Sequence, residues 1–99
     1  MSDHAVMVYF PLSDEDLDSL FDLEDALIDA IDEAGAGEFD GNEIGAGEAV
    51  LYMYGPDADK LFAAVEKVLR TAPMVREGYA VKRFGPPEDG VREVRVDLS

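Results

Sequence analysis

The stretch that decides the fold is residues 38–55, EFDGNEIGAGEAVLYMYG. Its second part, Ala49–Tyr54, is an apolar run rich in β-branched and aromatic residues, and it predicts a strand. A strand without polar alternation is typical of one that is covered on both faces. Glu38–Ile44 predicts a more polar strand that is broken at Gly41. The GAGE segment between them indicates a hairpin turn or a bulge, so the stretch predicts two neighbouring antiparallel strands.

Upstream of this hairpin, the chain predicts a strand and then a helix. Val6–Phe10 is apolar and too short for a helix, and Pro11 ends it. Ser13 followed by Asp16 is a variant of the capping box that begins helices, and Gly35 is a typical C-terminal cap. The inward face has helical spacing and comprises Leu23, Ala26, Leu27, Ala30, Ile31 and Ala34. A second, rotated stripe contains Leu17, Leu20 and Phe21, so residues 14–21 are either a separate turn of helix or a kinked extension.

Downstream of the hairpin, the pattern predicts a second helix and two further strands. Asp57 caps a helix that runs to about Ala72. Tyr79–Phe84 predicts a strand, and Gly85–Gly90 predicts a turn. Val91–Leu98 alternates between apolar and charged residues, which indicates a half-buried strand.

The order of these elements predicts an α+β fold. The first six resemble the βαββαβ split sandwich of ferredoxin-like domains, and the last is an additional C-terminal antiparallel strand. The length of 99 residues predicts a single domain over residues 1–99. In this arrangement the first and third strands are central and the second and fourth lie at the edges. The two most apolar strands, VMVYF and AVLYMY, are the first and third.

Because both helices of such a fold pack on one face of the sheet, the other face is left open. Strand alternation assigns a set of apolar and tyrosine side chains to this open face. Tyrosine suits a surface that is apolar but partly wet, and a contiguous patch of this kind marks a contact. The predicted interaction surface is Met7, Tyr9, Val50, Tyr52, Tyr54 and Tyr79. The alternative is that the fifth strand or a terminal segment covers part of it.

The formal net charge is −15, from 23 acidic and 8 basic residues, and residues 1–59 hold 17 acids without any Lys or Arg. Such a field repels nucleic acids and anionic membranes, so neither is an expected partner. It favours a protein partner of basic character, although high charge also simply keeps small proteins soluble. The N-terminus does not resemble a signal peptide, and cysteine is absent. We therefore expect a cytoplasmic protein.

The polar half of the hairpin is a second candidate site, formed by Asp40, Asn42, Glu43 and Glu48. Matched to a calcium loop from Asp40, it places Ile44 and Leu51 at ligand positions, so the match fails. GAGE lacks the Lys and the following helix of a phosphate loop. We predict no metal, cofactor or catalytic residue, and we expect His4 to be solvated.

These observations predict a small acidic interaction or regulatory module that binds its partner through the tyrosine-rich open face of the sheet. The partner can be a second copy of the chain, which would make the protein a homodimer. The alternative is a small-ligand-binding protein or a cofactor-free enzyme on a dimeric ferredoxin-like scaffold.

Overall fold

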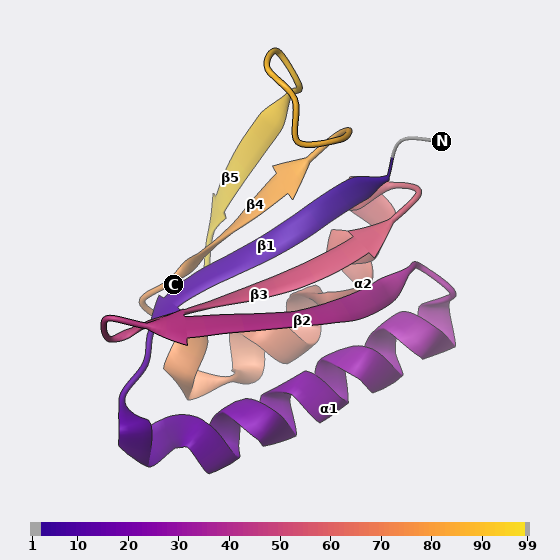
Figure 1. Cartoon of the computed structure of the whole chain (residues 1–99). Helices are drawn as coiled ribbons and strands as arrows, with labels where there is room; N and C mark the ends of the chain where they lie inside the picture. Colours follow the sequence, from indigo (N-terminus) through magenta and orange to yellow (C-terminus); the bar gives the residue numbers. More distant parts are fainter. Residues whose placement is uncertain (1–2, 99) are drawn as a thin grey trace.

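The computed structural model describes residues 3–98 and contains a five-stranded antiparallel sheet with two α-helices on one of its faces (Figure 1). The predicted α+β class is therefore confirmed. The strands are β1 (His4–Pro11), β2 (Glu38–Gly45), β3 (Glu48–Gly55), β4 (Tyr79–Arg83) and β5 (Glu93–Asp97). The helices are α1 (Leu17–Ala34) and α2 (Ala58–Thr71), and short 3-10 turns occupy Asp14–Asp16 and Pro73–Val75.

The strands lie in the order β2-β3-β1-β4-β5. β1 is in the middle and pairs with both β3 and β4, which agrees with its apolar sequence. The prediction that the fourth strand lies at an edge is wrong, because β5 pairs along its outer side from Tyr79↔Asp97 to Arg83↔Glu93. β5 thus extends the sheet in its own plane (Figure 1) and does not lie over the open face.

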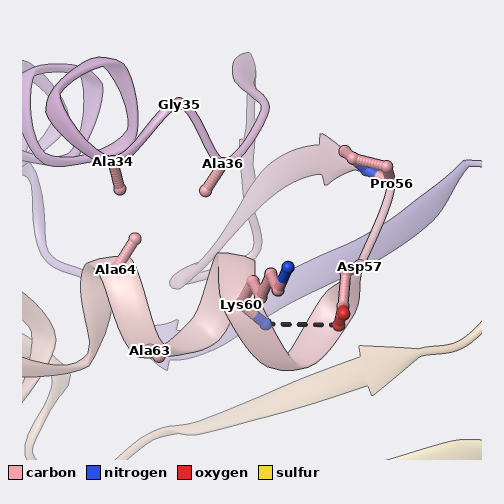
Figure 2. Close-up of a pocket in the computed structure, with 8 residues that line it drawn as sticks. All are labelled: Ala34, Gly35, Ala36, Pro56, Asp57, Lys60, Ala63 and Ala64. Atoms are coloured by element: carbon pink, nitrogen blue, oxygen red, sulfur yellow. Dashed lines mark hydrogen bonds between the residues drawn. The ribbon is translucent and has the colours of Figure 1, made fainter.

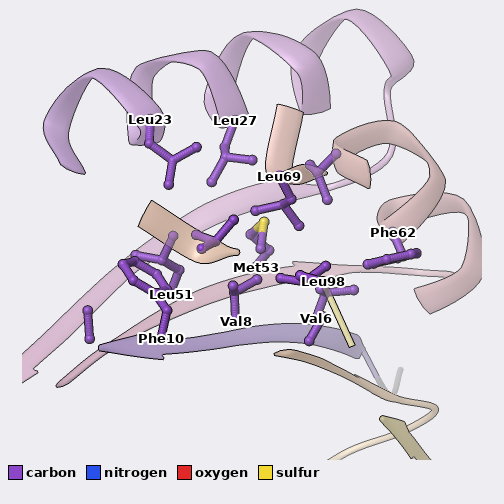
Figure 3. Packing of buried hydrophobic residues seen from close by; sticks show 14 of the residues in the cluster. Val6, Val8, Phe10, Leu23, Leu27, Leu51, Met53, Phe62, Leu69 and Leu98 are labelled. Carbon is purple, nitrogen blue, oxygen red and sulfur yellow. The ribbon is translucent and has the colours of Figure 1, made fainter. Parts of the chain in front are cut away.

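The core lies between the helices and the sheet (Figure 3). Val6 and Val8 of β1 are fully buried there, together with Leu51 and Met53 of β3. α1 contributes Leu20, Leu23, Leu27 and Ile31, and α2 contributes Ala58, Leu61, Phe62, Val65 and Leu69. Leu98, just beyond β5, is also buried in this cluster.

The buried stripe of α1 differs in part from the predicted one. Ala26 and Ala30 are half-buried and Ala34 is exposed, whereas Leu20 is fully buried. Phe21, from the predicted second stripe, has 51% of its surface exposed. The large side chains at helical spacing form one continuous line that packs on the sheet. The small alanines lie beside that line and are therefore less buried.

The start of α1 also differs from the prediction. Ser13 Oγ donates to the Asp16 carboxylate at 3.0 Å, and the Asp16 amide donates to the Ser13 carbonyl, so the predicted capping box does not form. Residues 14–16 make a separate 3-10 turn before the helix. The two other predicted caps are confirmed. Gly35 is left-handed with φ 59°, and the Asp57 carboxylate accepts from the amides of Asp59 and Lys60.

The hairpin between β2 and β3 forms as predicted, with some local differences. Ala46 and Gly47 have φ values of 53° and 78°, the two positive angles that a tight type I′ turn requires. Gly41 does not break β2, because the strand continues through a bulge between Phe39 and Gly41. Burial alternates along β3, so the prediction of cover on both faces is wrong. The helices cover one face, and the other is half-buried by its own neighbouring side chains.

Within residues 3–98, neither helix combines the length and the apolar character needed to cross a membrane.

Candidate interaction surface

The face of the sheet opposite the helices is built from alternate residues of the three interior strands, and we call it the open face. β1 contributes Ala5, Met7 and Tyr9, β3 contributes Val50, Tyr52 and Tyr54, and β4 contributes Tyr79, Val81 and Arg83. No element of residues 3–98 lies over this surface (Figure 1). The six residues predicted from the sequence to form an interaction surface therefore come together on one face.

The strand register fixes how these side chains neighbour one another. Met7 lies between its partners Tyr52 and Val81, and Tyr9 lies between Val50 and Tyr79. Directly opposed residues of antiparallel strands have Cβ atoms about 5 Å apart, so each row is in contact across the strands. Met7 is buried under its neighbours although no helix covers it, whereas the four tyrosines stay half-buried.

Specific contacts hold the side chains of Tyr9 and Tyr79 in place. The rings of Tyr9 and Tyr79 are stacked, with centroids 5.0 Å apart and planes at 17°. The Tyr9 hydroxyl donates to the Met7 sulfur at 3.8 Å. The Arg95 guanidinium lies over the Tyr79 ring at 3.9 Å, which is a cation–π geometry. Because these contacts already restrict the side chains, less conformational entropy is lost when a partner binds.

The electrostatics of this face favour neutral tyrosines. Burial raises the pKa of Tyr9, and the neighbouring Tyr79 hydroxyl and the Glu93 carboxylate raise it further. Desolvation also raises the pKa of Tyr52, and the negative charge of Glu43 adds to the effect. The raised pKa values keep the hydroxyls of Tyr9 and Tyr52 protonated in the physiological pH range, and a protonated hydroxyl is a hydrogen-bond donor.

The charged residues of the open face are arranged around its apolar centre. Glu38 and Glu43 of β2 face outward beside Tyr54 and Val50, and Glu48 begins β3 on the same side. Across the sheet, Arg83 pairs with Ala5 and Arg95 pairs with Val81. Sequence reasoning missed both arginines, although the alternation of β5 separates Arg95 from Val94 and Val96 and so contained the signal.

The predicted polar hairpin site is not gathered into one place. Asn42 turns towards the helical side, where its amide donates to the Glu24 carboxylate of α1 at 2.5 Å. Glu43 and Glu48 lie on the rim of the open face, and Asp40 is the extra residue of the bulge. Among residues 3–98 there is no group of three or more side chains placed to hold a metal ion.

The prediction that His4 is solvated is wrong, because its side chain is half-buried and makes two contacts. Its Nδ1 accepts a hydrogen bond from the Ala58 amide at 3.0 Å, at the beginning of α2. Its ring also meets the Phe84 ring edge to face, with centroids 5.7 Å apart. The residue is half-buried and ties β1 to α2, a contact across 54 residues of sequence that no local pattern indicates.

A hollow of about 510 Å³ lies on the helical side, between the end of α1 and the beginning of α2 (Figure 2). Its lining is mostly small and comprises Ala34, Gly35, Ala36, Pro56, Asp57, Lys60, Ala63 and Ala64. The Asp57 carboxylate is already engaged as the helix cap. The other charged side chain of the lining is Lys60, which has no such capping role.

Comparisons with protein-family models, with curated proteins and with solved structures found no match to this chain.

Proposed function

We propose that this chain is a protein-interaction module whose contact surface is the open face, and that its framework is ferredoxin-like with β5 added outside β4. The strand order β2-β3-β1-β4 supports the second part, because it places the first and third strands inside and follows a βαββαβ sequence of elements. The observation that carries the first part is the cluster of half-buried tyrosines around Met7 on a sheet face without helices.

The physical basis is that the half-buried tyrosines of this face still have ring surface to bury. Tyrosine rings bury large areas on contact, and their hydroxyls stay satisfied at a partly wet boundary. Tyrosine is also among the residues that dominate binding energy at interfaces. The stacking of Tyr9 on Tyr79 holds this surface in one arrangement, so less conformational entropy is lost on docking.

The charge of the chain narrows the class of partner. An acidic protein of net charge −15 attracts a basic protein and repels nucleic acid and anionic membranes. We keep the cytoplasm as the proposed compartment, because the chain uses no cysteine.

A second candidate function is the binding of a small ligand in the hollow between α1 and α2. Its volume of about 510 Å³ falls within the usual range of ligand pockets, and Lys60 offers one cation to an anionic group. Ala64→Leu would fill part of this hollow, so a ligand that binds there should stabilise the wild type against heat and have a smaller effect on Ala64→Leu.

The proposed function is tested by affinity capture from extracts of the native host. We expect a defined partner with the wild type and its loss with Tyr52→Asp, because the substitution removes the Tyr52 ring from beside Met7 at the apolar centre of the face. Phe21→Asp is the matched control, because it places the same charge on an exposed apolar residue of α1, on the helical side. Val81→Lys repeats the test from the other side of β1.

Circular dichroism would first show that each variant folds. The same set of captured proteins with the wild type, Tyr52→Asp and Val81→Lys would contradict the proposal.

A further inference from the structure

β2 lies at one edge of the sheet, and its outer side pairs with no strand of residues 3–98 (Figure 1). The hairpin turn fixes which of its backbone groups point outward. Gly45 and Glu48 flank the two-residue turn and form the first hydrogen-bonded pair, and such pairs alternate along antiparallel strands. Asn42 and Ile44 belong to the other pairs, so their backbone N–H and C=O groups point away from β3. Both residues are exposed, which leaves these groups open to a further strand.

The large apolar side chains that remain exposed lie beside this edge. Among residues 3–98 they are Phe21 (51%), Ile28 (39%) and Ile44 (47%). The hydrogen bond from the Asn42 amide to the Glu24 carboxylate joins α1 to β2. Phe21 and Ile28 lie three residues before and four residues after Glu24, so they share its side of the helix. Ile44 lies two residues after Asn42, so it shares the helical face of β2.

The directions of α1 and β2 bring Phe21 and Ile44 to a similar level. The two elements are joined by residues 35–37 and run in opposite directions (Figure 1). Phe21 lies about 4.5 Å along the helix from Glu24, and Ile44 lies about 6.8 Å along β2 from Asn42, in the same direction. A strand added to β2 would lie about 4.8 Å outside it, where its side chains on the helical face would cover these apolar residues. We call the three apolar side chains and the free backbone edge the β2 edge surface.

Charge narrows the class of strand that this surface accepts. α1 carries seven carboxylates and β2 carries three, and neither element contains Lys or Arg. Glu43 lies between Asn42 and Ile44 and points to the open face, so the opposed side chain of an added strand would lie about 5 Å from it. A basic side chain is favoured at that position. A second copy of β2 would instead place carboxylates against carboxylates, and such like charges on an edge disfavour self-pairing.

We propose that the β2 edge surface binds an extended basic segment of another protein, which adds to β2 as a sixth, antiparallel strand. The segment alternates apolar residues, which cover Phe21, Ile28 and Ile44, with Lys or Arg residues on the side of Glu43. In this mode of recognition, main-chain hydrogen bonds provide affinity and alternate side chains provide specificity. Every neighbouring pair of strands in the sheet is antiparallel, and antiparallel pairing is slightly the more stable kind. The surface is separate from the open face, so the inference does not depend on the proposed function.

The other free edge of the sheet is less suited to this role. β5 is five residues long, whereas β2 is eight. On β5, the Arg95 guanidinium is already paired with the Asp97 carboxylate at 3.1 Å. The bulge between Phe39 and Gly41 limits the regular part of β2 to residues 41–45, so the added strand is short. Interfaces of such small size bind weakly and reversibly, and titrations therefore have to extend to high protein concentration.

The probe is a fluorescein-labelled synthetic peptide, KVKVKVK, and its binding is measured by fluorescence anisotropy at a fixed salt concentration. In an antiparallel strand whose valines face α1, the valine N–H groups bond to β2 and the lysine N–H groups point to solvent. N-methylation of the three valines should therefore raise the dissociation constant by about tenfold or more. N-methylation of the last three lysines should change it by less than about threefold, although the two peptides have the same charge and composition.

Matched protein variants locate the site. Ile44→Thr keeps a β-branched residue but removes apolar surface, and it should raise the dissociation constant about fivefold. Val81→Thr makes a similar change on the open face and should leave it unchanged within about twofold. Glu43→Gln should raise it about threefold and weaken its salt dependence, whereas Glu88→Gln removes the same charge from the turn between β4 and β5 and should not. Glu43, Ile44 and Glu88 are exposed, so these variants are expected to fold, which circular dichroism would check.

Three outcomes would overturn the proposal. The first is a peptide that does not bind the wild type into the millimolar range. The second is an equal effect of the two N-methylated peptides, because binding would then depend on charge and not on strand pairing. The third is wild-type affinity for both Ile44→Thr and Glu43→Gln, which would place the peptide on another surface.

The same variants separate this inference from the proposed function. A partner captured from extracts that is lost with Tyr52→Asp and retained with Ile44→Thr supports the open face alone. A partner that is lost with Ile44→Thr and retained with Tyr52→Asp supports the β2 edge surface alone.

Discussion

Gly55, at the end of β3, provides the sharpest test of how the hairpin is joined to α1. A Cβ atom at this position would lie 2.2 Å from the carbonyl oxygen of Ala36 and 3.3 Å from the Cα of Gly37. The oxygen belongs to the backbone, so no rotation of a side chain can relieve the overlap. Gly55→Ala therefore forces the segment after α1 away from β3 by about 1 Å.

The expected loss of stability follows from two opposing effects. Overpacking of this kind costs about 1–3 kcal/mol, and the absence of a side-chain escape places Gly55→Ala near the upper end. Alanine also restricts the unfolded chain, which contributes about 0.4–1 kcal/mol in favour of folding. The free energy of unfolding should fall by about 2 kcal/mol. The urea midpoint should then fall by roughly 1 M for a domain of this size.

Urea unfolding followed by circular dichroism measures this change, and Gly45→Ala is the matched control. Gly45 ends β2 in the same hairpin, but among residues 3–98 no atom that would crowd a Cβ there lies within 4 Å. Gly45→Ala should change the free energy of unfolding by less than about 1 kcal/mol, in the stabilising direction. Equal midpoints for Gly55→Ala and Gly45→Ala would refute the steric reasoning.

Three further predictions concern the caps, the core and the tyrosines. Asp57→Ala should lower the free energy of unfolding by about 1 kcal/mol in urea, because it removes the acceptor for two amides of α2; an unchanged midpoint would contradict this. Leu27→Ala should cost about 3 kcal/mol by thermal or urea unfolding, while Ile28→Ala, at an exposed neighbour, should cost less than about 1 kcal/mol; similar losses would reject the packing. The raised pKa values of Tyr9 and Tyr52 mean that their contribution to stability is complete below the unfolded pKa of about 10 and is lost as pH rises through the folded pKa. Urea midpoints from about pH 8 to about pH 11 should fall less for the double Tyr→Phe variant at these positions than for the wild type, and parallel curves would show that the shifts are absent.

The elements of this fold follow closely from local sequence signals. The apolar runs of β1 and β3, the cap at Asp57 and the left-handed Gly35 all depend on residues that lie a few positions apart. The same is true of the alternation that separates Tyr52 from Leu51 and places them on opposite faces of the sheet. Strand alternation is a property of the backbone. It therefore assigns the six residues of the predicted interaction surface to one face without knowledge of the partners of each strand.

Where sequence reasoning failed, the missing information was a long-range pairing or a choice between similar local options. Ser13 and Asp16 satisfy a capping pattern, but the two side chains bond to each other because a 3-10 turn begins there. His4 was expected in solvent, yet it accepts from the amide of Ala58 on α2, 54 residues away in the chain.

The candidate interaction surface shows the same division. Its apolar centre was predictable, because Met7 and the tyrosines alternate with core residues in the sequence. Its rim was not predicted, because the position of Arg95 depends on the pairing of β5 with β4. The sequence placed most acids before residue 60 and all bases after residue 59. Seven of these acids lie on α1, on the helical side of the sheet, which agrees with the predicted helix and its expected side.

The amino-acid sequence by itself determined the elements, their order, the residues that alternate on each strand and the strong negative charge. These depend on local backbone geometry and on composition, which short windows of sequence contain. The tertiary structure alone decided that β5 lies outside β4 and that β2 continues through a bulge. It also decided that three glutamates border the open face on the β2 side, and that two arginines border it with Glu93 and Asp97 on the β5 side. The physical reason is that strand partners and the registers between strands are chosen by the packing of the whole sheet against both helices, and no single segment contains that information.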